Sequence, residues 1–137
     1  MSKLRILIAD DRQQVRQELR AILPLAGDIE IVGEAADGLE AVHLATVLQP
    51  QAVLLDLQMP VMDGCQAAAQ IKAVCPICRV VALTIHGDET TRRRAAEAGF
   101  DAFIVKGAPI SALVEALGQN EEDSHARDNQ SQENEEG

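Results

Sequence analysis

The chain has 137 residues and 14.7 kDa, which allows one compact domain and excludes a two-domain enzyme. Hydrophobic residues make up 47% of it, and no apolar run approaches the ~20 residues of a membrane span. The net charge of −10 disfavours non-specific binding to nucleic acid, and the absence of Trp and Tyr disfavours stacking on single-stranded bases. Because the N-terminus also lacks a signal-peptide pattern, we expect a cytoplasmic protein.

The charge is unevenly distributed and marks a boundary near residue 118. Residues 119–137 contain seven acidic side chains against the single base Arg127, a net charge of −6, which leaves −4 for residues 1–118. This segment has no Val, Ile, Leu, Phe or Met, so it lacks the apolar surface that would offset the entropy of ordering it. The sequence therefore predicts a folded domain over 1–118 and a disordered acidic tail over 119–137.

Taken in chain order, residues 1–118 alternate between strand-like and helix-like patterns. A strand at 4–9 is followed by helical spacing of apolar residues up to Leu23, where Pro24 is expected to end or kink the helix early. The segment 29–34 places Glu30 and Glu34 on one side, as suits a strand near a sheet edge. Further strands are predicted at 52–55, 80–83 and 102–105, and further helices around 41–48, 67–71, 89–98 and 110–117.

Five strands alternating with five helices predict an α/β fold with a parallel sheet and helices on both of its faces. Ligands of such sheets bind beyond the C-terminal ends of the strands, so the residues that follow each strand are the candidates for function. No glycine-rich dinucleotide motif and no Gly-Lys-Ser/Thr motif is present. The strand-end residues are instead Asp10, Asp11, Asp56, Thr84 and Lys106.

These side chains predict a site for phosphoryl transfer. Carboxylates 4 Å apart repel each other by ~4 kcal/mol per pair at an effective dielectric constant of 20, so they require a cation. Mg²⁺ suits them because it takes one or two carboxylates and keeps sites for phosphoryl oxygens. A central carboxylate such as Asp56 can attack phosphorus and form an acyl phosphate, with Lys106 opposite it.

Four segments together resemble the receiver domain of two-component response regulators. They are Ile8-Ala9-Asp10-Asp11, the run Leu-Leu-Asp-Leu-Gln-Met-Pro-Val-Met-Asp-Gly over 54–64, Leu83-Thr84, and Phe103-Ile104-Val105-Lys106. The resemblance covers residues 4–118 and implies a flavodoxin-like (βα)5 three-layer sandwich with strand order 2-1-3-4-5. The segment 99–109 is similar to receivers that are joined to a LuxR-type helix-turn-helix domain.

The resemblance also implies residue roles. Asp56 is expected to accept the phosphoryl group, and Mg²⁺ to be bound by Asp10, Asp11, Asp56 and the backbone carbonyl of Gln58. Thr84 and Lys106 would contact the phosphoryl group, and Phe103 would be the aromatic residue that switches with Thr84. The side chains expected to control access of water to the phosphoryl group are Ile85 and His86.

The implied partners follow from the same resemblance. A sensor histidine kinase or a histidine phosphotransfer protein would supply the phosphoryl group, and helix 4, strand 5 and helix 5 would form the surface read by a downstream protein. Phosphorylation-dependent homodimerisation is left open. Nothing after Gly118 could form a helix-turn-helix domain, so we expect no direct DNA binding by this chain, no membrane partner, and no enzymatic activity beyond assisting its own phosphorylation and dephosphorylation.

Several single motifs allow a second interpretation. Asp10-Asp11 could be a helix N-cap with an acid in the first turn. A Mg²⁺-dependent phosphohydrolase would generally have an acid two residues after its nucleophile, where this chain has Gln58. Cys75 and Cys78 have the spacing of redox or zinc sites, but structural packing is favoured because the pair is isolated. Three consecutive arginines at 92–94 favour a solvated helix face, with an acidic partner as the alternative.

Overall fold

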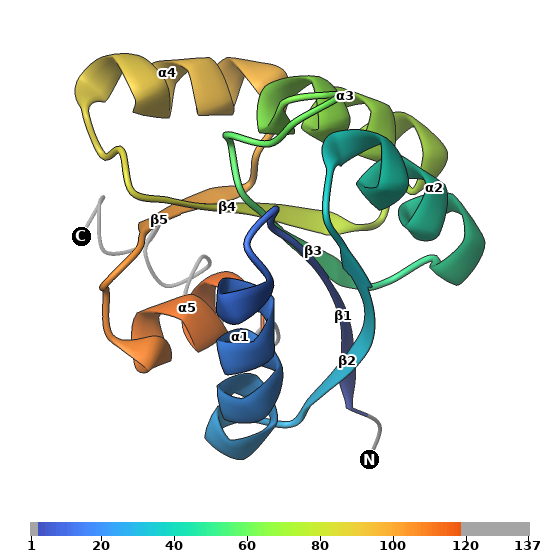
Figure 1. The fold of residues 1–137 in the computed structure, drawn as a ribbon, viewed down its shortest axis with the longest axis vertical. Coiled ribbons are helices and arrows are strands. Elements are labelled where there is room, and N and C mark those ends of the chain that lie inside the picture. The colour runs from blue at the N-terminus through green and yellow to red at the C-terminus, as the bar shows by residue number, and fades with distance from the viewer. Residues whose placement is uncertain (1–2, 119–137) are drawn as a thin grey trace, which may run out of the picture.

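The structure is a computed structural model and describes residues 3–118. Strands and helices alternate along this part of the chain as the sequence pattern predicts (Figure 1). The strands are β1 Leu4–Ala9, β2 Ile29–Ala35, β3 Ala52–Leu55, β4 Arg79–Thr84 and β5 Ala102–Val105. The helices are α1 Gln13–Ala26, α2 Gly38–Leu48, α3 Gly64–Val74, α4 Glu89–Ala98 and α5 Ile110–Ala116.

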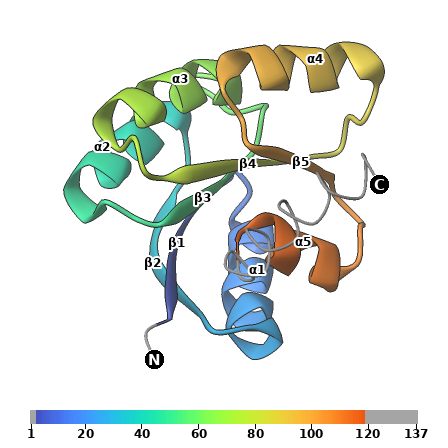
Figure 2. The same cartoon turned by 180° about the vertical axis from the view of Figure 1, so that it is seen from behind.

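The five strands form one parallel sheet in the order β2-β1-β3-β4-β5. Helices α1 and α5 cover one face of the sheet, and α2, α3 and α4 cover the other (Figures 1 and 2). This is the flavodoxin-like three-layer fold that the sequence predicts. The strand order reverses between β1 and β3, which places a crevice outside the C-terminal ends of these two strands.

The core has two halves because successive residues of the central strands point to opposite faces. Leu7 and Val53 pack toward α2 and α3, whereas Ile6 and Leu54 pack toward α1 and α5. The buried residues that α2 and α3 contribute are mainly alanines, which let these helices lie close to the sheet. They are Gly38, Ala41, Ala45, Gly64, Ala67, Ala68 and, as the one larger side chain, Ile71.

Strand β2 lies at the edge of the sheet, as its alternating pattern predicts. Ile29 is buried and Glu30 is exposed, and the pairing with β1 shifts register between Ile6 and Leu7. After this shift Glu34 pairs with Ile8, close to the C-terminal end of β1. An acidic side chain of β2 is thereby brought near the crevice.

The expectation that Pro24 ends helix α1 early is wrong. The helix continues to Ala26, and the backbone N–H of Gly27 still donates to the Leu23 carbonyl at 3.2 Å. Proline lacks an N–H and therefore removes only its own bond to the carbonyl four residues earlier, so the residues that follow can still donate, as Gly27 does. Pro24 is itself exposed, so its ring displaces no core side chain.

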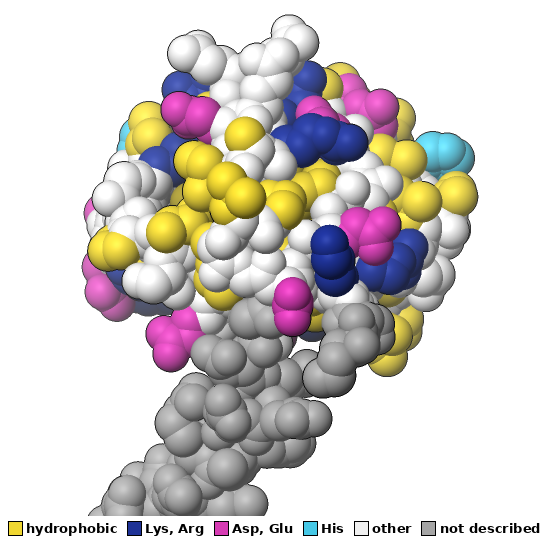
Figure 3. All heavy atoms as spheres, turned by 90° about the horizontal axis from the view of Figure 1, so that it is seen from below, with side chains coloured by type: hydrophobic (Ala, Val, Ile, Leu, Met, Phe, Trp, Pro, Cys, Tyr) yellow, Lys and Arg dark blue, Asp and Glu magenta, His cyan; other side chains and the backbone are white. Residues whose placement is uncertain are grey.

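Large hydrophobic side chains remain exposed on the face that carries α1 and α5. Figure 3 shows hydrophobic atoms gathered on this side of the molecule, and Ile22, Leu25 and Ile110 are among the large exposed hydrophobic residues of these two helices. None of the helices within residues 3–118 is both long and apolar enough to cross a membrane.

Candidate phosphoryl-transfer site

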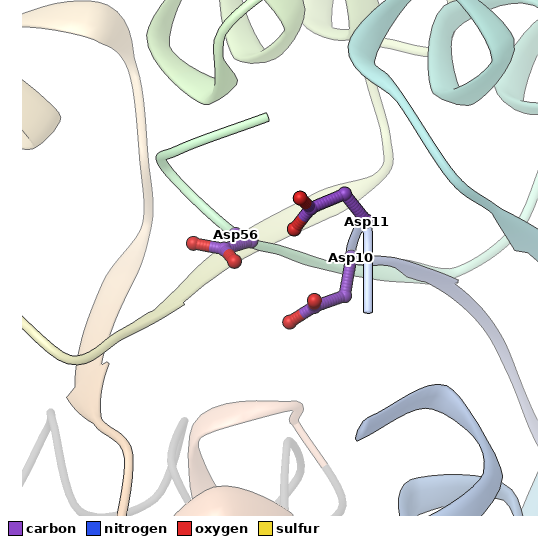
Figure 4. Close-up of side chains that lie close together, drawn as sticks. All are labelled: Asp10, Asp11 and Asp56. Carbon is purple, nitrogen blue, oxygen red and sulfur yellow. The ribbon is translucent and has the colours of Figure 1, made fainter. Parts of the chain in front are cut away.

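Three aspartates meet at the C-terminal edge of the sheet (Figure 4). Asp10 and Asp11 follow β1 and Asp56 follows β3, and one carboxylate oxygen of each lies within 4.8 Å of the others. The backbone N–H of Asp56 donates to the Ala9 carbonyl at 3.0 Å, which holds the two strand ends side by side. Asp10 and Asp56 are only 2% and 6% exposed, whereas Asp11 is exposed, so a buried acidic pair lies beneath a third acid.

The helix-cap interpretation of Asp10 and Asp11 is wrong. The N-cap residue of α1 is Arg12, which makes no side-chain capping bond. The Asp10 carboxylate instead accepts a hydrogen bond from the backbone N–H of Arg12 itself at 2.9 Å, and Asp10 lies two residues before the N-cap position. This bond turns the chain after β1 and keeps the Asp10 side chain over the sheet edge.

Lys106, which follows β5, bridges the two buried aspartates. Its Nζ atom donates to Asp10 Oδ2 at 2.9 Å and to Asp56 Oδ2 at 3.3 Å. The lysine side chain is 15% exposed, so this contact is shielded from water more than an ordinary surface ion pair. The sequence predicted the pairing of Lys106 with Asp56, but the shorter contact is to Asp10.

Burial raises the pKa of the Asp56 carboxyl above its ordinary value. The hydrogen bond from the backbone N–H of Gln58, at 3.1 Å, and the charge of Lys106 oppose this rise, while the neighbouring Asp10 adds to it. A raised pKa means that the ionised form is disfavoured in the folded protein. A cation bound beside Asp56 would therefore stabilise its ionised carboxylate.

Close backbone packing fixes the loop that follows Asp56. Helix α3 begins at Gly64, and a Cβ atom at this position would collide with the carbonyl oxygen of Asp56. Asp63 caps the helix with a capping box formed with Gln66. Only glycine lets the helix start lie directly against the residue that follows β3.

Thr84 and Phe103 lie on neighbouring strands near the acidic cluster. Thr84 ends β4, is 1% exposed and accepts a hydrogen bond from the backbone N–H of His86 at 3.3 Å. Phe103, on β5, is half-buried against Leu57, and the Arg92 guanidinium lies 4.5 Å from the centre of its ring. Phe103 thus packs beneath α4 with a cationic side chain over it.

Two cavities open beside the cluster, and both are lined by Asp11 and Gln58. The first, about 250 Å³, is also lined by Asp56, Lys106 and Ile85. The second, about 600 Å³, extends along α4 and is lined by Thr84 and His86 among others. Ile85 and His86 are both expected from the sequence to control access of water, but these neighbouring residues line different cavities.

The donor set fits Mg²⁺. Three carboxylates of like charge lie together, two of them buried. The Lys106 ammonium and the Arg12 guanidinium, whose Nε lies 4.0 Å from Asp10 Oδ1, neutralise only part of this charge. Buried ionised groups require a counter-charge, and Mg²⁺ is bound through one or two carboxylates while it retains several water molecules. Asp10, Asp11 and Asp56 are the side chains that would hold it.

Sequence reasoning missed one feature of the site. Arg16, on α1, donates from Nη1 to the backbone carbonyl of Asp10 at 2.7 Å and from Nε to Glu34 Oε1 at 3.2 Å. The charge pattern offers only a weak signal, because the acceptor at the site is a main-chain atom and Glu34 lies 18 residues away on β2.

Two other motifs lie outside the acidic cluster. Cys75 and Cys78 are completely buried in the core, and burial raises the pKa of the Cys78 thiol to about 12. A protonated, inaccessible thiol is a poor metal ligand and nucleophile, which favours structural packing.

The arginines at 92–94 are exposed on α4, as expected for a solvated face.

The fold and the site together define an α/β protein with an acidic crevice at the C-terminal edge of its sheet, and comparisons with known proteins identify the family. The family model of the response regulator receiver domain matches residues 6–118. The chain therefore belongs to the response regulator receiver domain family, as the sequence motifs indicate.

Curated relatives and solved structures agree with this assignment. The response regulator protein VraR of Staphylococcus saprophyticus is 35% identical over 114 residues, which are 83% of this chain and 54% of VraR. The chain thus spans about half the length of the curated relatives it matches. The receiver domain of the response regulator NarL from Mycobacterium tuberculosis has a TM-score of 0.81 and is 32% identical, with 85% of this chain and 94% of that chain covered.

A further solved structure is a complex of CheX and CheY with BeF3 and Mg²⁺ from Borrelia burgdorferi. The matched chain is 27% identical with a TM-score of 0.77, and the match covers 85% of this chain and 88% of that chain. As a receiver domain of the two-component response regulators, the chain is of the class that acts as phospho-accepting signalling switches.

Proposed function

We propose that Asp56 is the phospho-acceptor of this receiver domain and that Asp10, Asp11, Asp56 and the backbone carbonyl of Gln58 hold Mg²⁺. The observation that supports this most directly is the convergence of three carboxylates, two of them buried, with Lys106 bonded to both buried ones. Such a concentration of unneutralised charge is costly to the fold, so its presence points to a ligand that supplies positive charge.

The chain's own residues account for the transfer step. An Asp56 carboxylate oxygen attacks phosphorus, an O–P bond forms, and the P–N bond to the donor histidine breaks with its electron pair left on the imidazole. Lys106 then leaves its position between the carboxylates and contacts the phosphoryl oxygens, while the Thr84 hydroxyl donates to another of them. When bound, Mg²⁺ neutralises charge on the transferring group.

The proposed output is a change of shape at α4, β5 and α5. Thr84 would move toward the phosphoryl oxygens, and Phe103 would turn into the space that Thr84 leaves. The half-buried position of Phe103 supports this step, since its ring lies between the core and the Arg92 guanidinium rather than deep in the core. A turn of this ring would therefore also displace Arg92 on the exposed face of α4.

The proposed donor is a sensor histidine kinase or a histidine phosphotransfer protein, and the receiver of the signal is a downstream protein that reads the α4, β5 and α5 surface. The complex with BeF3 and Mg²⁺ among the structural neighbours supports the ligand chemistry, because beryllofluoride mimics a phosphoryl group.

Localisation in the cytoplasm stays part of this proposal, as do phosphorylation-dependent homodimerisation and the absence of direct DNA binding.

Catalytic activity is proposed only toward the protein's own phosphoryl group. A phosphohydrolase that uses an aspartyl phosphate would place an acid two residues after the nucleophile, and Gln58 stands there. Gln58 is exposed and lines both cavities, so its neutral side chain lies where such an acid would have to act. Turnover of a generic phosphomonoester would favour the hydrolase instead.

The wild-type protein is expected to accept one phosphoryl group from acetyl phosphate, with loss of acetate, and only in the presence of Mg²⁺. Intact-mass spectrometry would detect the adduct, and fragmentation after borohydride reduction would locate it. Chelation of Mg²⁺ with EDTA should remove labelling because the cation neutralises the developing charge. Phosphate on a residue other than Asp56, or none with any donor, would contradict the assignment.

Removal of residues 119–137 is expected to leave the fold and the labelling intact. This segment lies outside the described residues, and its sequence has no large aliphatic side chain that could anchor it in the core. The melting temperature of the shortened chain should stay within about 2 °C of the full chain, well below the shift produced by 1 kcal/mol in a domain of this size. A larger fall would show that the tail supports the fold.

A further inference from the structure

Arg16 ties the backbone of the acidic cluster to strand β2. Its guanidinium donates to the Asp10 carbonyl oxygen at 2.7 Å and to the Glu34 carboxylate at 3.2 Å. The arginine side chain is only 16% exposed, so both bonds are partly shielded from water. The Asp10 carbonyl belongs to the peptide that joins Asp10 to Asp11, and Arg16 therefore holds the plane of that peptide.

We propose that Arg16 is a positioning residue for the Mg²⁺ site, an inference that rests on the proposed function. The two buried aspartates are held by direct bonds to their carboxylates, from Arg12 N–H, Gln58 N–H and Lys106. Asp11 is exposed, and its direction is set by the backbone from which it projects. By fixing the peptide before Asp11, Arg16 determines whether the third carboxylate points at the cation.

Glu34 provides the anchor for this arrangement. One of its carboxylate oxygens accepts from Arg16 and the other accepts from Arg20 Nη1 at 2.9 Å. Arg20 is 55% exposed, and the bond described for it goes to Glu34 and not to the acidic cluster. The two arginines thus share one carboxylate and one helix, while only Arg16 reaches the peptide between Asp10 and Asp11, which makes Arg20 an internal control.

Charge and geometry act in opposite directions at Arg16. A positive charge close to the cluster repels Mg²⁺, so a neutral residue at this position would strengthen cation binding if charge alone mattered. Lysine separates the two effects because it keeps the charge but lacks the planar fork that contacts two acceptors at once. Weaker Mg²⁺ binding by Arg16→Lys would therefore report the loss of positioning.

The experiment compares Arg16→Lys with Arg20→Lys in the full chain. The chain has no Trp or Tyr, so Mg²⁺ binding is followed by titration calorimetry or by amide chemical shifts rather than by intrinsic fluorescence. Arg16→Lys is expected to bind Mg²⁺ about tenfold more weakly than wild type, the lower end of what loss of an outer-shell contact costs. Arg20→Lys should bind as wild type does.

A second readout distinguishes positioning from damage to the fold. With acetyl phosphate, Arg16→Lys should need about tenfold more Mg²⁺ for half-maximal labelling but reach the wild-type rate at saturation. Glu34→Gln weakens the carboxylate anchor but leaves the Arg16 guanidinium in place. It should raise the Mg²⁺ concentration for half-maximal labelling by a smaller factor, and it serves as the test of positioning if Arg16→Lys does not fold.

The outcomes separate this inference from the proposed function. The positioning role is overturned if wild type binds Mg²⁺ and Arg16→Lys binds it equally well or more tightly. If Arg16→Lys does not fold, the same comparison is made with Glu34→Gln. A lower saturating rate of labelling with unchanged Mg²⁺ affinity would overturn it as well. If the wild-type chain binds no Mg²⁺, the proposed function itself fails.

Discussion

Replacing Asp56 with alanine is expected to abolish phosphorylation by acetyl phosphate. The substitution removes the nucleophilic oxygen, and the two remaining carboxylates, Asp10 and Asp11, are proposed to hold the cation rather than to attack phosphorus. Loss of a nucleophile is not compensated by the remaining charges, since these stabilise the transferring group without forming the new bond. Intact-mass spectrometry should show no adduct at any Mg²⁺ concentration.

Asp11→Ala is the matched comparison for this result. Asp11 is exposed and serves the cation rather than the bond to phosphorus, so labelling of this variant should fall but recover as Mg²⁺ is raised. The two aspartates therefore differ in whether Mg²⁺ rescues the defect. Labelling of Asp56→Ala that persists, or that returns at high Mg²⁺, would place the phospho-acceptor elsewhere.

A stability measurement checks that the Asp56 variant is folded. The raised pKa of Asp56 means that its ionised form destabilises the folded state at neutral pH, and that folding becomes more favourable as the pH falls through that pKa. Asp56→Asn removes this charge in a side chain of the same shape. Its melting temperature in the absence of Mg²⁺ should therefore equal or exceed that of wild type. Asp56→Asn should also fail to be labelled, and in this folded variant unfolding cannot be the cause.

The location of the site could be predicted because each candidate follows an apolar strand segment. Asp10, Asp56 and Lys106 stand directly after a strand, Thr84 is the last residue of β4, and parallel strands end at the same edge of a sheet. The order β2-β1-β3-β4-β5 then places β1 and β3 side by side, which brings the aspartates within reach of one another.

The partners within the site could not be predicted from the same pattern. Lys106 has a flexible side chain that reaches two carboxylates, and only the geometry shows that its shorter contact is to Asp10. Arg16 bonds to a main-chain carbonyl, for which no side-chain signal exists in the sequence. Its second partner, Glu34, is brought near by the shifted register that pairs it with Ile8.

The directions of the side chains in the loop after β4 likewise could not be predicted from the sequence. Strand alternation sets which way Leu83 and Thr84 point, but the strand ends at Thr84. Beyond it, Ile85 and His86 follow irregular backbone, and they line separate cavities. His86 lines the cavity of about 600 Å³ along α4, and Ile85 lines the cavity of about 250 Å³ that is also lined by Asp56, so Ile85 is the better placed of the two to restrict water.

The phosphorylated state is expected to last for minutes or more because Ile85 restricts the approach of water. Its side chain lines the cavity of about 250 Å³ together with Asp56 and Lys106, although 57% of the residue remains exposed. Hydrolysis requires a water molecule in line with the bond to Asp56, and a branched side chain at the cavity wall narrows that path. Gln58, which lines the same cavity, has no negative charge with which to act as a base.

Ile85→Ala is therefore expected to lose its phosphoryl group roughly fivefold faster, which corresponds to a barrier lower by about 1 kcal/mol. Labelling by acetyl phosphate should accelerate as well, since the donor approaches along the same line that water follows. Ile77→Ala is the control, because Ile77 is also largely exposed but lines neither cavity beside the cluster. Decay of the wild-type adduct within seconds, or equal decay of the Ile85→Ala and wild-type adducts, would show that access at this wall does not limit hydrolysis.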